Sequence, residues 1–171
     1  MDTYLAIASR RDERRYAPEP LPEVTAETIL DAGRLAGSAA NRQPWTFVVV
    51  EGPERREHLA GGVFVPENVL SAALVVGIVV RGTGPTAFDA GRAAQNMLLA
   101  AWNAGISSCP NGIADPERVA AALEAGEEER PVIVLSFGLP ARPRDPEALP
   151  AAEWSRRANR RPLADVVRRL R

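Results

Sequence analysis

The sequence predicts a fold in which a small β-sheet is covered by helices. Its 171 residues match the usual length of one domain. Three short runs, at residues 45–50, 73–80 and 131–137, are rich in β-branched and aromatic residues and predict strands. Helical patterns separate these runs, and such an order is typical of mixed layer architectures. We therefore expect one domain, residues 1–171, built around this sheet.

Five helices are predicted around these strands. Pro53 and Pro116 each stand where a first helical turn begins. Gly105 and Gly126 each follow a last turn. The run 88–104 is small or apolar on nearly every side, which predicts a central, buried helix. The predicted helices cover residues 2–9, 25–35, 53–60, 88–104 and 117–125.

The last part of the chain has a different composition. Residues 138–150 contain four prolines, which predicts an extended arm. The arginine-rich end that follows has a short apolar pattern at Leu163, Val166, Val167 and Leu170. Two interpretations stay open for this segment: it is a solvated tail, or it buries its apolar residues on a second subunit.

Composition excludes several classes of function. All 21 basic residues are arginines, so chemistry that needs a lysine Schiff base is excluded. One cysteine and one histidine exclude an internal disulfide and a multi-histidine metal site. A net charge of −1 argues against a nucleic-acid partner. The sequence has neither a long apolar run nor a signal-peptide pattern, so we expect a cytoplasmic protein without a membrane partner.

The chain also lacks the common catalytic signatures. It has no phosphate-binding GxxxxGK[ST] loop, no HExxH and no GxSxG. Cys109 has no histidine near it in the sequence that could activate it, so a catalytic cysteine is not expected. We therefore predict no catalytic side chain, and any chemistry would come from a bound cofactor.

Four segments could bind such a cofactor. Residues 10–16 hold four arginines, which predicts either an anion clamp or a solvated charged turn. Residues 37–45 present amide side chains that suit the edge of a heterocycle, or simply connect a helix to a strand. Residues 105–112 are a glycine-containing loop that a ligand could approach closely. The basic stretch 156–163 is a solubilising tail or a second contribution to a phosphate site.

Taken together and in this order, these segments resemble the FMN-dependent nitroreductase family. The resemblance is carried by residues 10–16, 36–50, 88–112, 131–143 and 160–167. It implies an α+β fold with a small mixed central sheet flanked by helices. It also implies a homodimer with FMN at the subunit interface, and an extended C-terminal arm, residues 138–171, that reaches the partner subunit.

The resemblance also implies which residues touch FMN. The first arginine segment is expected to bind the phosphate and ribityl oxygens of FMN. Asp12 stands there in place of a serine that is common in the family, and it is expected to face the ribityl hydroxyls or an arginine. The partner subunit contributes the amide segment, and backbone N–H groups after the long helix face flavin N5 and O4. The basic stretch near the end adds phosphate contacts, with no choice made between its two arginines. The implied residues are Arg10, Arg11, Asp12 and Arg14; Ser38, Asn41 and Gln43; Pro110, Asn111 and Gly112; and Arg160 and Arg161.

The implied activity is hydride transfer from NADH or NADPH, through flavin N5, to an electron-poor acceptor such as a nitroaromatic or a quinone. Many family members insert helices where this chain has only residues 81–87, so the lid over the site should be small or absent. Three alternatives stay open. The protein could store flavin with little turnover, it could be a specialised relative that remodels flavin or dehydrogenates a peptide heterocycle, or it could be a structural or interaction protein.

Overall fold

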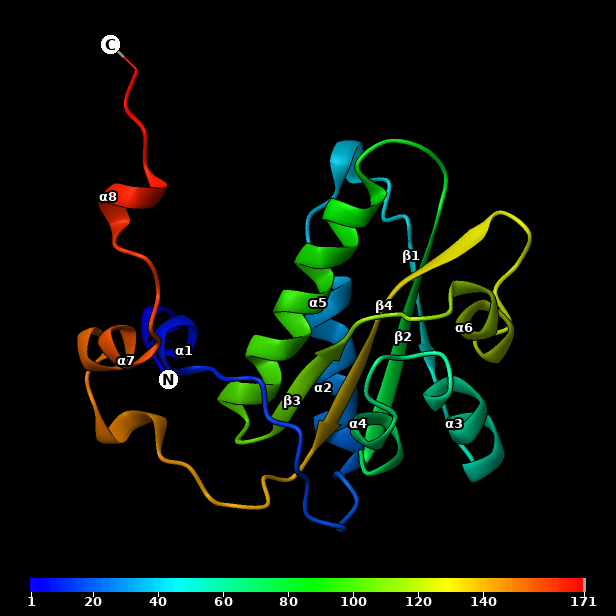
Figure 1. Ribbon diagram of the computed structural model, residues 1–171, viewed down its shortest axis with the longest axis horizontal. Coiled ribbons are helices and arrows are strands. Elements are labelled where there is room, and N and C mark those ends of the chain that lie inside the picture. The colour runs from blue at the N-terminus through cyan, green and yellow to red at the C-terminus, as the bar shows by residue number, and fades with distance from the viewer. Residues whose placement is uncertain (171) are drawn as a thin grey trace.

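The computed structural model describes residues 1–170 and contains one four-stranded sheet with the order β1-β2-β4-β3 (Figure 1). The strands are β1 (Trp45–Val49), β2 (Leu74–Arg81), β3 (Ser107–Asn111) and β4 (Glu129–Gly138). The three predicted strands are confirmed as β1, β2 and β4, and so is the α+β class. The expected mixed sheet is wrong, because all three pairings are antiparallel. β2 and β3 run in the same direction, but β4 lies between them.

Helices cover both faces of this sheet (Figure 1). The predicted helices are confirmed with small shifts at their ends, whereas α4 and the two 3-10 turns are too short for a periodic signal. Their bounds are α1 Thr3–Ser9, α2 Glu23–Arg34, α3 Pro53–Ala60, α4 Glu67–Leu70, α5 Thr86–Asn103, α6 Pro116–Ala122, α7 Ala151–Arg157 and α8 Leu163–Val166, with 3-10 turns η1 Ala39–Asn41 and η2 Pro146–Ala148.

The core forms two clusters, one on each face of β2. Val76, Ile78 and Val80 pack toward α2 and α5. Val75 and Val79 pack toward α3 and α6. The first seven residues of β2 are buried, as expected for a strand covered on both faces. β2 is therefore the centre of the hydrophobic core.

The long helix α5 is buried on one side only, which corrects the expectation of a helix enclosed all round. Its inner face, including Ala90 and Met97, belongs to the core. Gly33 of α2 lies so close to Met97 that an added Cβ would be 2.2 Å from the Met97 Cε atom, so a small residue is needed there. Phe88 is 69% exposed on the outer face. Small residues made the outer face look apolar in the sequence, although the rest of the described chain leaves Phe88 and its neighbours on this face exposed.

The predicted loop at 105–112 is the edge strand β3. Gly105, with φ 76°, ends the helix, and residues 107–111 then pair with β4. The sequence Ser-Ser-Cys-Pro-Asn has no strand signal of its own, and its extended form depends on pairing with a distant segment. Proline is tolerated because β3 lies at the sheet edge.

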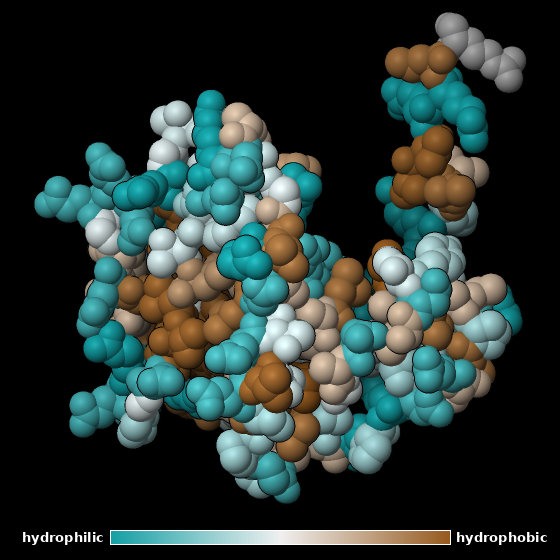
Figure 2. All heavy atoms as spheres, turned by 180° about the vertical axis from the view of Figure 1, so that it is seen from behind, coloured by the Kyte–Doolittle hydropathy of each residue, from teal (hydrophilic) through white to brown (hydrophobic). Residues whose placement is uncertain are grey.

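Beyond β4 the chain leaves the sheet and returns to α1. Figure 1 shows α7 lying beside α1 while α8 projects away from the body. Trp154 of α7 donates from Nε1 to the Pro146 carbonyl at 2.8 Å. Leu163 is 75% and Leu170 is 89% exposed, and Figure 2 shows this tail standing clear of the rest of the molecule. No helix within residues 1–170 is long and apolar enough to cross a bilayer.

Candidate functional site

In the segment after α1, Arg10 has one side-chain N–H that is held in place but makes no hydrogen bond within residues 1–170. Arg10 donates from NH2 to Asp12 Oδ1 at 2.8 Å, and its side chain is only 12% exposed. Asp12 thus faces an arginine, one of the two arrangements expected for it. The Arg10 Nε atom is buried and has no hydrogen-bond partner within residues 1–170. A buried N–H without an acceptor is costly, so this atom is suited to an incoming oxygen.

Arg11 connects the end of α1 to α7. Its NH1 donates to the carbonyls of Ala8 and Arg10, each at 2.8 Å, and its NH2 donates to the Trp154 carbonyl at 3.0 Å. The guanidinium also lies 5.8 Å from the centroid of the Trp154 ring. These contacts cap the end of α1 and attach α7 to it, so most of this side chain is committed to anchoring the arm.

Several arginines lie near one another beside α1. Burial lowers the pKa of Arg11, and the charges of Arg160 and Arg144 lower it further. Arg161 instead donates to the Asp165 carbonyl at 2.8 Å within the arm. Of the two arginines named near the C-terminus, Arg160 therefore belongs to this group. Arg10 and Arg14 both lie near Cys109, and Arg14 lines a cavity together with Arg144. We call Arg10, Arg11, Arg14, Arg144 and Arg160 the arginine cluster, and a dianion placed there would relieve its like-charge repulsion.

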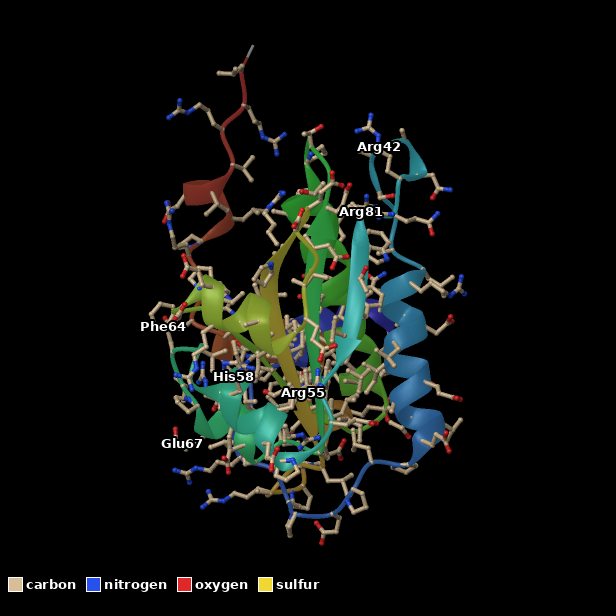
Figure 3. The ribbon with its side chains drawn as sticks, turned by 90° about the vertical axis from the view of Figure 1, so that its right-hand side faces the viewer. Arg42, Arg55, His58, Phe64, Glu67 and Arg81 are labelled. Atoms are coloured by element: carbon tan, nitrogen blue, oxygen red, sulfur yellow. The ribbon has the colours of Figure 1, made fainter. Side chains whose placement is uncertain are left out.

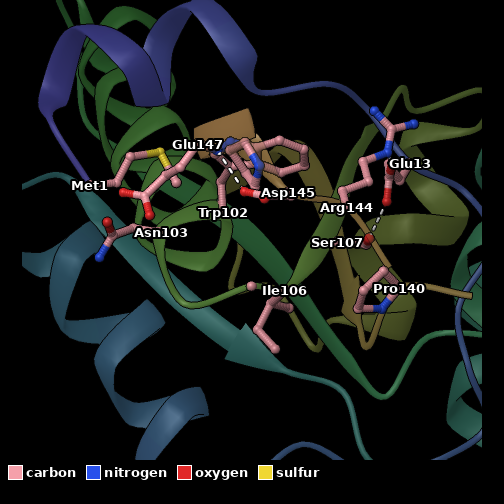
Figure 4. Close-up of a pocket in the computed structure, with 12 residues that line it drawn as sticks. Met1, Glu13, Trp102, Asn103, Ile106, Ser107, Pro140, Arg144, Asp145 and Glu147 are labelled. Carbon is pink, nitrogen blue, oxygen red and sulfur yellow. Dashed lines mark hydrogen bonds and ion pairs between the residues drawn. The ribbon is translucent and has the colours of Figure 1, made fainter. Parts of the chain in front are cut away.

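β3 supports the arginine cluster. The Glu13 N–H donates to the Ser108 carbonyl at 3.0 Å, which lays the segment along the free edge of the strand. The Glu13 carboxylate also pairs with Arg144 and accepts from the Ser107 hydroxyl, as Figure 4 shows in the neighbouring pocket of about 260 Å³. The Ser108 hydroxyl is buried without a partner in the described part of the chain. A polar ligand beside β3 would have both a cation and a hydroxyl to bind.

The thiol beside this segment is not set up as a nucleophile. Burial raises the pKa of the Cys109 thiol, and the nearby Arg14 charge only partly opposes this effect. A raised pKa keeps the group as an unreactive thiol at neutral pH. No group of three or more His, Cys, Asp or Glu residues in the described chain could hold a metal ion.

The end of β3 is held by a buried hydrogen-bond network that the sequence did not reveal. Asn111 is 3% exposed, and its Oδ1 accepts from Asn68 Nδ2 at 2.8 Å. Its own Nδ2 donates to the Ser136 Oγ atom at 3.1 Å and to the Cys109 and Val134 carbonyls. The Ser136 and Tyr16 hydroxyls are 2.8 Å apart. The Asn111 side chain therefore fixes the end of the strand against its neighbours.

Two of the three expected backbone donors are not available to a ligand. Pro110 has no N–H, and the Asn111 backbone pairs with Val134 of β4, so of the three only the Gly112 N–H can face a ligand. An added Cβ at Gly112 would lie 3.0 Å from the Phe64 ring, so the backbone and this ring are in close contact. The Phe64 N–H donates to the Gly112 carbonyl at 3.1 Å, which attaches the segment before α4 to the end of β3.

The predicted amide residues form a compact loop, residues 38–43, which we call the amide loop. The Gln43 N–H donates to Ser38 Oγ at 2.8 Å, and Gln43 Nε2 donates to the Asn41 carbonyl at 3.3 Å. Ala40, Asn41 and Gln43 have φ values of 50°, 54° and 48°, in the left-handed region. Such strain in residues other than glycine persists where a surrounding structure or a function requires it. The structure thus brings Ser38, Asn41 and Gln43 together.

Within one chain the amide loop and the arginine cluster are far apart. The Ala39 N–H donates to Asp89 Oδ2 at 3.0 Å, near the start of α5. Near its other end, Trp102 Nε1 donates to Ser9 Oγ at 2.9 Å, just before the arginines. Asp89 and Trp102 are separated by about 20 Å of helix, at 1.5 Å per residue. Figure 1 shows η1 and α1 near opposite ends of α5.

Comparison with known proteins identifies the family. The model of the Nitroreductase family matches residues 7–74 and 81–139. A relative from Archaeoglobus fulgidus, named "Putative NADH dehydrogenase/NAD(P)H nitroreductase", is 33% identical over 150 residues, which cover 81% of this chain and 86% of the relative. A similarly named protein of Methanothermobacter thermautotrophicus is 29% identical over 150 residues, covering 82% of this chain and 78% of that protein.

Solved structures agree with this match. The crystal structure of a nitroreductase family protein from Clostridium difficile 630 superposes with a TM-score of 0.83 at 21% identity and covers 98% of both chains. A nitroreductase-type protein from Desulfovibrio desulfuricans, solved in complex with FMN, has a TM-score of 0.80 at 26% identity and covers 100% of this chain and 98% of its own. The chain therefore belongs to the nitroreductase family.

Proposed function

We propose that the protein is an FMN-dependent oxidoreductase that moves a hydride from NADH or NADPH to an electron-poor acceptor. The observation that carries this proposal is the buried, unpartnered Arg10 Nε atom within the arginine cluster, in a member of the nitroreductase family. The relatives named above as NADH dehydrogenase/NAD(P)H nitroreductase, and the relative that holds FMN, support both cofactor and reaction class.

The proposed roles follow from which donors are free. Arg10, Arg14 and Arg160 hold the FMN phosphate, because guanidinium groups bind phosphate with charge-assisted hydrogen bonds. Arg11 anchors the arm beside them. The Gly112 N–H faces the flavin ring. Bound FMN supplies the atom that accepts and passes on the hydride, and the protein contributes orientation and positive charge. No titrating side chain is needed.

We further propose that the protein works as a homodimer. The amide loop and the arginine cluster lie near opposite ends of α5, so one chain does not bring them to one ligand. A second copy running the other way would place Ser38, Asn41 and Gln43 beside the first copy's arginines. The exposed Phe88 on the outer face of α5 and the exposed apolar residues of the tail supply surface for this contact.

The visible spectrum of the purified protein tests the cofactor assignment. The proposal predicts a yellow protein with flavin absorbance that bleaches on addition of NADH or NADPH and recovers when a quinone or nitroaromatic is added. A colourless protein that does not bind added FMN would contradict it. Size measurement in solution with and without FMN tests the dimer, since a flavin-bound monomer would contradict the shared site.

A flavin-storing protein is the second candidate, and the short connection between β2 and α5 favours it. Only residues 82–85 separate these elements, so little chain is present there to enclose a substrate. Stopped-flow reduction of the bound flavin separates the two functions. Rapid bleaching by a nicotinamide nucleotide supports the enzyme, and flavin that stays oxidised supports storage.

A further inference from the structure

A second cavity lies near the opposite end of α5 from the arginine cluster. It has a volume of about 320 Å³ and lies between the amide loop, the start of β1, the end of β2 and the start of α5. Its lining includes Arg42, Arg81, Gln43, Trp45 and Thr83. Figure 3 shows Arg42 and Arg81 at the same end of the molecule. We call it the distal cavity. None of the residues proposed to hold the FMN phosphate lines it.

The distal cavity has an excess of positive charge. Arg42 and Arg81 are both exposed, and neither guanidinium makes an ion pair within residues 1–170. Its lining contains one carboxylate, Asp89, which is 3% exposed and already accepts from the Ala39 N–H. Glu129, the cross-strand partner of Arg81, accepts from the Thr46 hydroxyl and the Gly126 N–H and forms no ion pair with Arg81. Both arginines therefore line the open cavity without an ion pair within residues 1–170.

These two arginines are not needed to hold the neighbouring loop. Arg130, which does not line the cavity, donates from NH1 to the Gly82 carbonyl at 3.4 Å and also bonds to the Thr86 hydroxyl. The loop between β2 and α5 is thus fixed from β4. The left-handed residues of the amide loop carry Arg42 beside it, in a backbone conformation that costs free energy.

We propose that the distal cavity binds the anionic oxygen group of a substrate through Arg42 and Arg81. This inference rests on the proposed function, because Gln43 lines the cavity and is also proposed to reach the flavin of the second copy. The cavity would then border that flavin. A guanidinium group binds a carboxylate or a phosphate bidentately, by donating two parallel hydrogen bonds. The anion comes either from a carboxylate on an aromatic acceptor or from the phosphates of the nicotinamide donor.

Kinetics with charged and neutral substrates separate these two sources. The variants are Arg42→Gln, Arg81→Gln and their combination, with Arg34→Gln as the matched control, because Arg34 is exposed and lies outside the cavity. The acceptors are 4-nitrobenzoate and its neutral counterpart 4-nitrobenzamide, and flavin reduction by NADH and by NADPH is followed separately. Losing a hydrogen bond to a charged group predicts about a tenfold lower kcat/KM for one anionic substrate.

Each kinetic outcome either supports one source of the anion or overturns the inference. Loss with 4-nitrobenzoate but not with 4-nitrobenzamide supports an acceptor carboxylate. Loss in flavin reduction by the nucleotides supports the donor phosphates. Equal losses with both acceptors and unchanged flavin reduction overturn the inference, as does an unchanged combined variant. The Arg34→Gln control should match the wild type throughout.

A binding measurement separates failure of this inference from failure of the proposed function. Benzoate and inorganic pyrophosphate are titrated by calorimetry into the protein after FMN has been added in excess, so that bound FMN occupies the arginine cluster. The wild type and Arg34→Gln should bind at least one of them, and the combined Arg42→Gln, Arg81→Gln variant should lose that binding while keeping the wild-type thermal unfolding. Binding that survives in this variant, or is absent from the wild type, overturns the inference even if the protein is yellow. A colourless protein that shows this binding would contradict the proposed function alone.

Discussion

The two polar regions at the ends of α5 use arginine differently. Around α1, Arg10 and Arg11 are tied to Asp12, to backbone carbonyls and to Trp154, and β3 beside them is fixed by buried amides. In the distal cavity, Arg42 and Arg81 have no such partners, and the loop that carries Arg42 is strained and exposed. The region around α1 is therefore held by contacts within the chain, whereas the arginines of the distal cavity are left for a ligand. The number of arginines in a segment does not show whether they hold the fold or bind a ligand.

The largest expected difference concerns the two asparagines. Asn111→Ala removes the bonds to Asn68 and Ser136 and leaves buried groups unpaired, so it should lower the free energy of unfolding by about 2–4 kcal/mol. Asn41→Ala, in the exposed amide loop, should change it by less than about 1 kcal/mol. Urea unfolding of both variants checks this. Equal losses would remove the distinction between a fixed and an open region.

Loss of Arg10 should be the next largest effect, and it acts on the ligand. Arg10→Gln removes the buried guanidinium with the free Nε, so the Kd for FMN should rise about 10- to 100-fold. Arg15→Gln is the matched control, because Arg15 is exposed in the same segment. Fluorescence titration with FMN measures both. Similar affinities for the two variants would mean that Arg10 does not contact the phosphate.

How much of this the sequence predicted depends on the range of the interactions. Helix α3 was predicted with its observed ends, because a proline at the first position of a helix is a local signal. β3 was missed, because its strand form comes from pairing with β4. The anchoring role of Arg11 was missed for the same reason, since Trp154 lies 143 residues away in the sequence.

The candidate site divides in the same way. Ser38, Asn41 and Gln43 were implied by the resemblance to the family, and the structure brings them into one loop. Asn68 and Ser136 were not identified. Each is a polar residue in an ordinary segment and becomes significant only because both meet Asn111 in the core. Buried amide networks of this kind leave no periodic signal in a sequence.

A smaller effect tests how the arm is attached. Arg11→Leu and Trp154→Phe should each loosen α7 from α1, and a double-mutant cycle should give a coupling free energy of about 1 kcal/mol. Limited proteolysis should then cut the single variants faster between β4 and α7. Wild-type cleavage rates in both variants would show that other contacts hold the arm.

The smallest expected effect is a dependence of stability on alkaline pH. Burial raises the pKa of the Cys109 thiol above 9.0, its ordinary value. The unfolded chain therefore loses this proton first, so the contribution is intact below about pH 8 and is lost as the pH rises through the folded pKa. Cys109→Ala should lose less stability than the wild type between about pH 8 and about pH 10. Parallel losses in thermal unfolding would contradict the buried thiol.

The proposal that two subunits share each flavin site is tested most directly by mixing two defective chains. One chain carries Arg10→Gln and the other carries Asn41→Leu with Gln43→Leu, and differently tagged copies allow the mixed dimer to be purified. Both defects then fall in one site of the mixed dimer, and the other site has neither. We predict that each variant alone binds FMN weakly and that the mixed dimer regains one tight FMN site per two chains. Mixed dimers that bind no more tightly than either variant alone would contradict a site built from two copies.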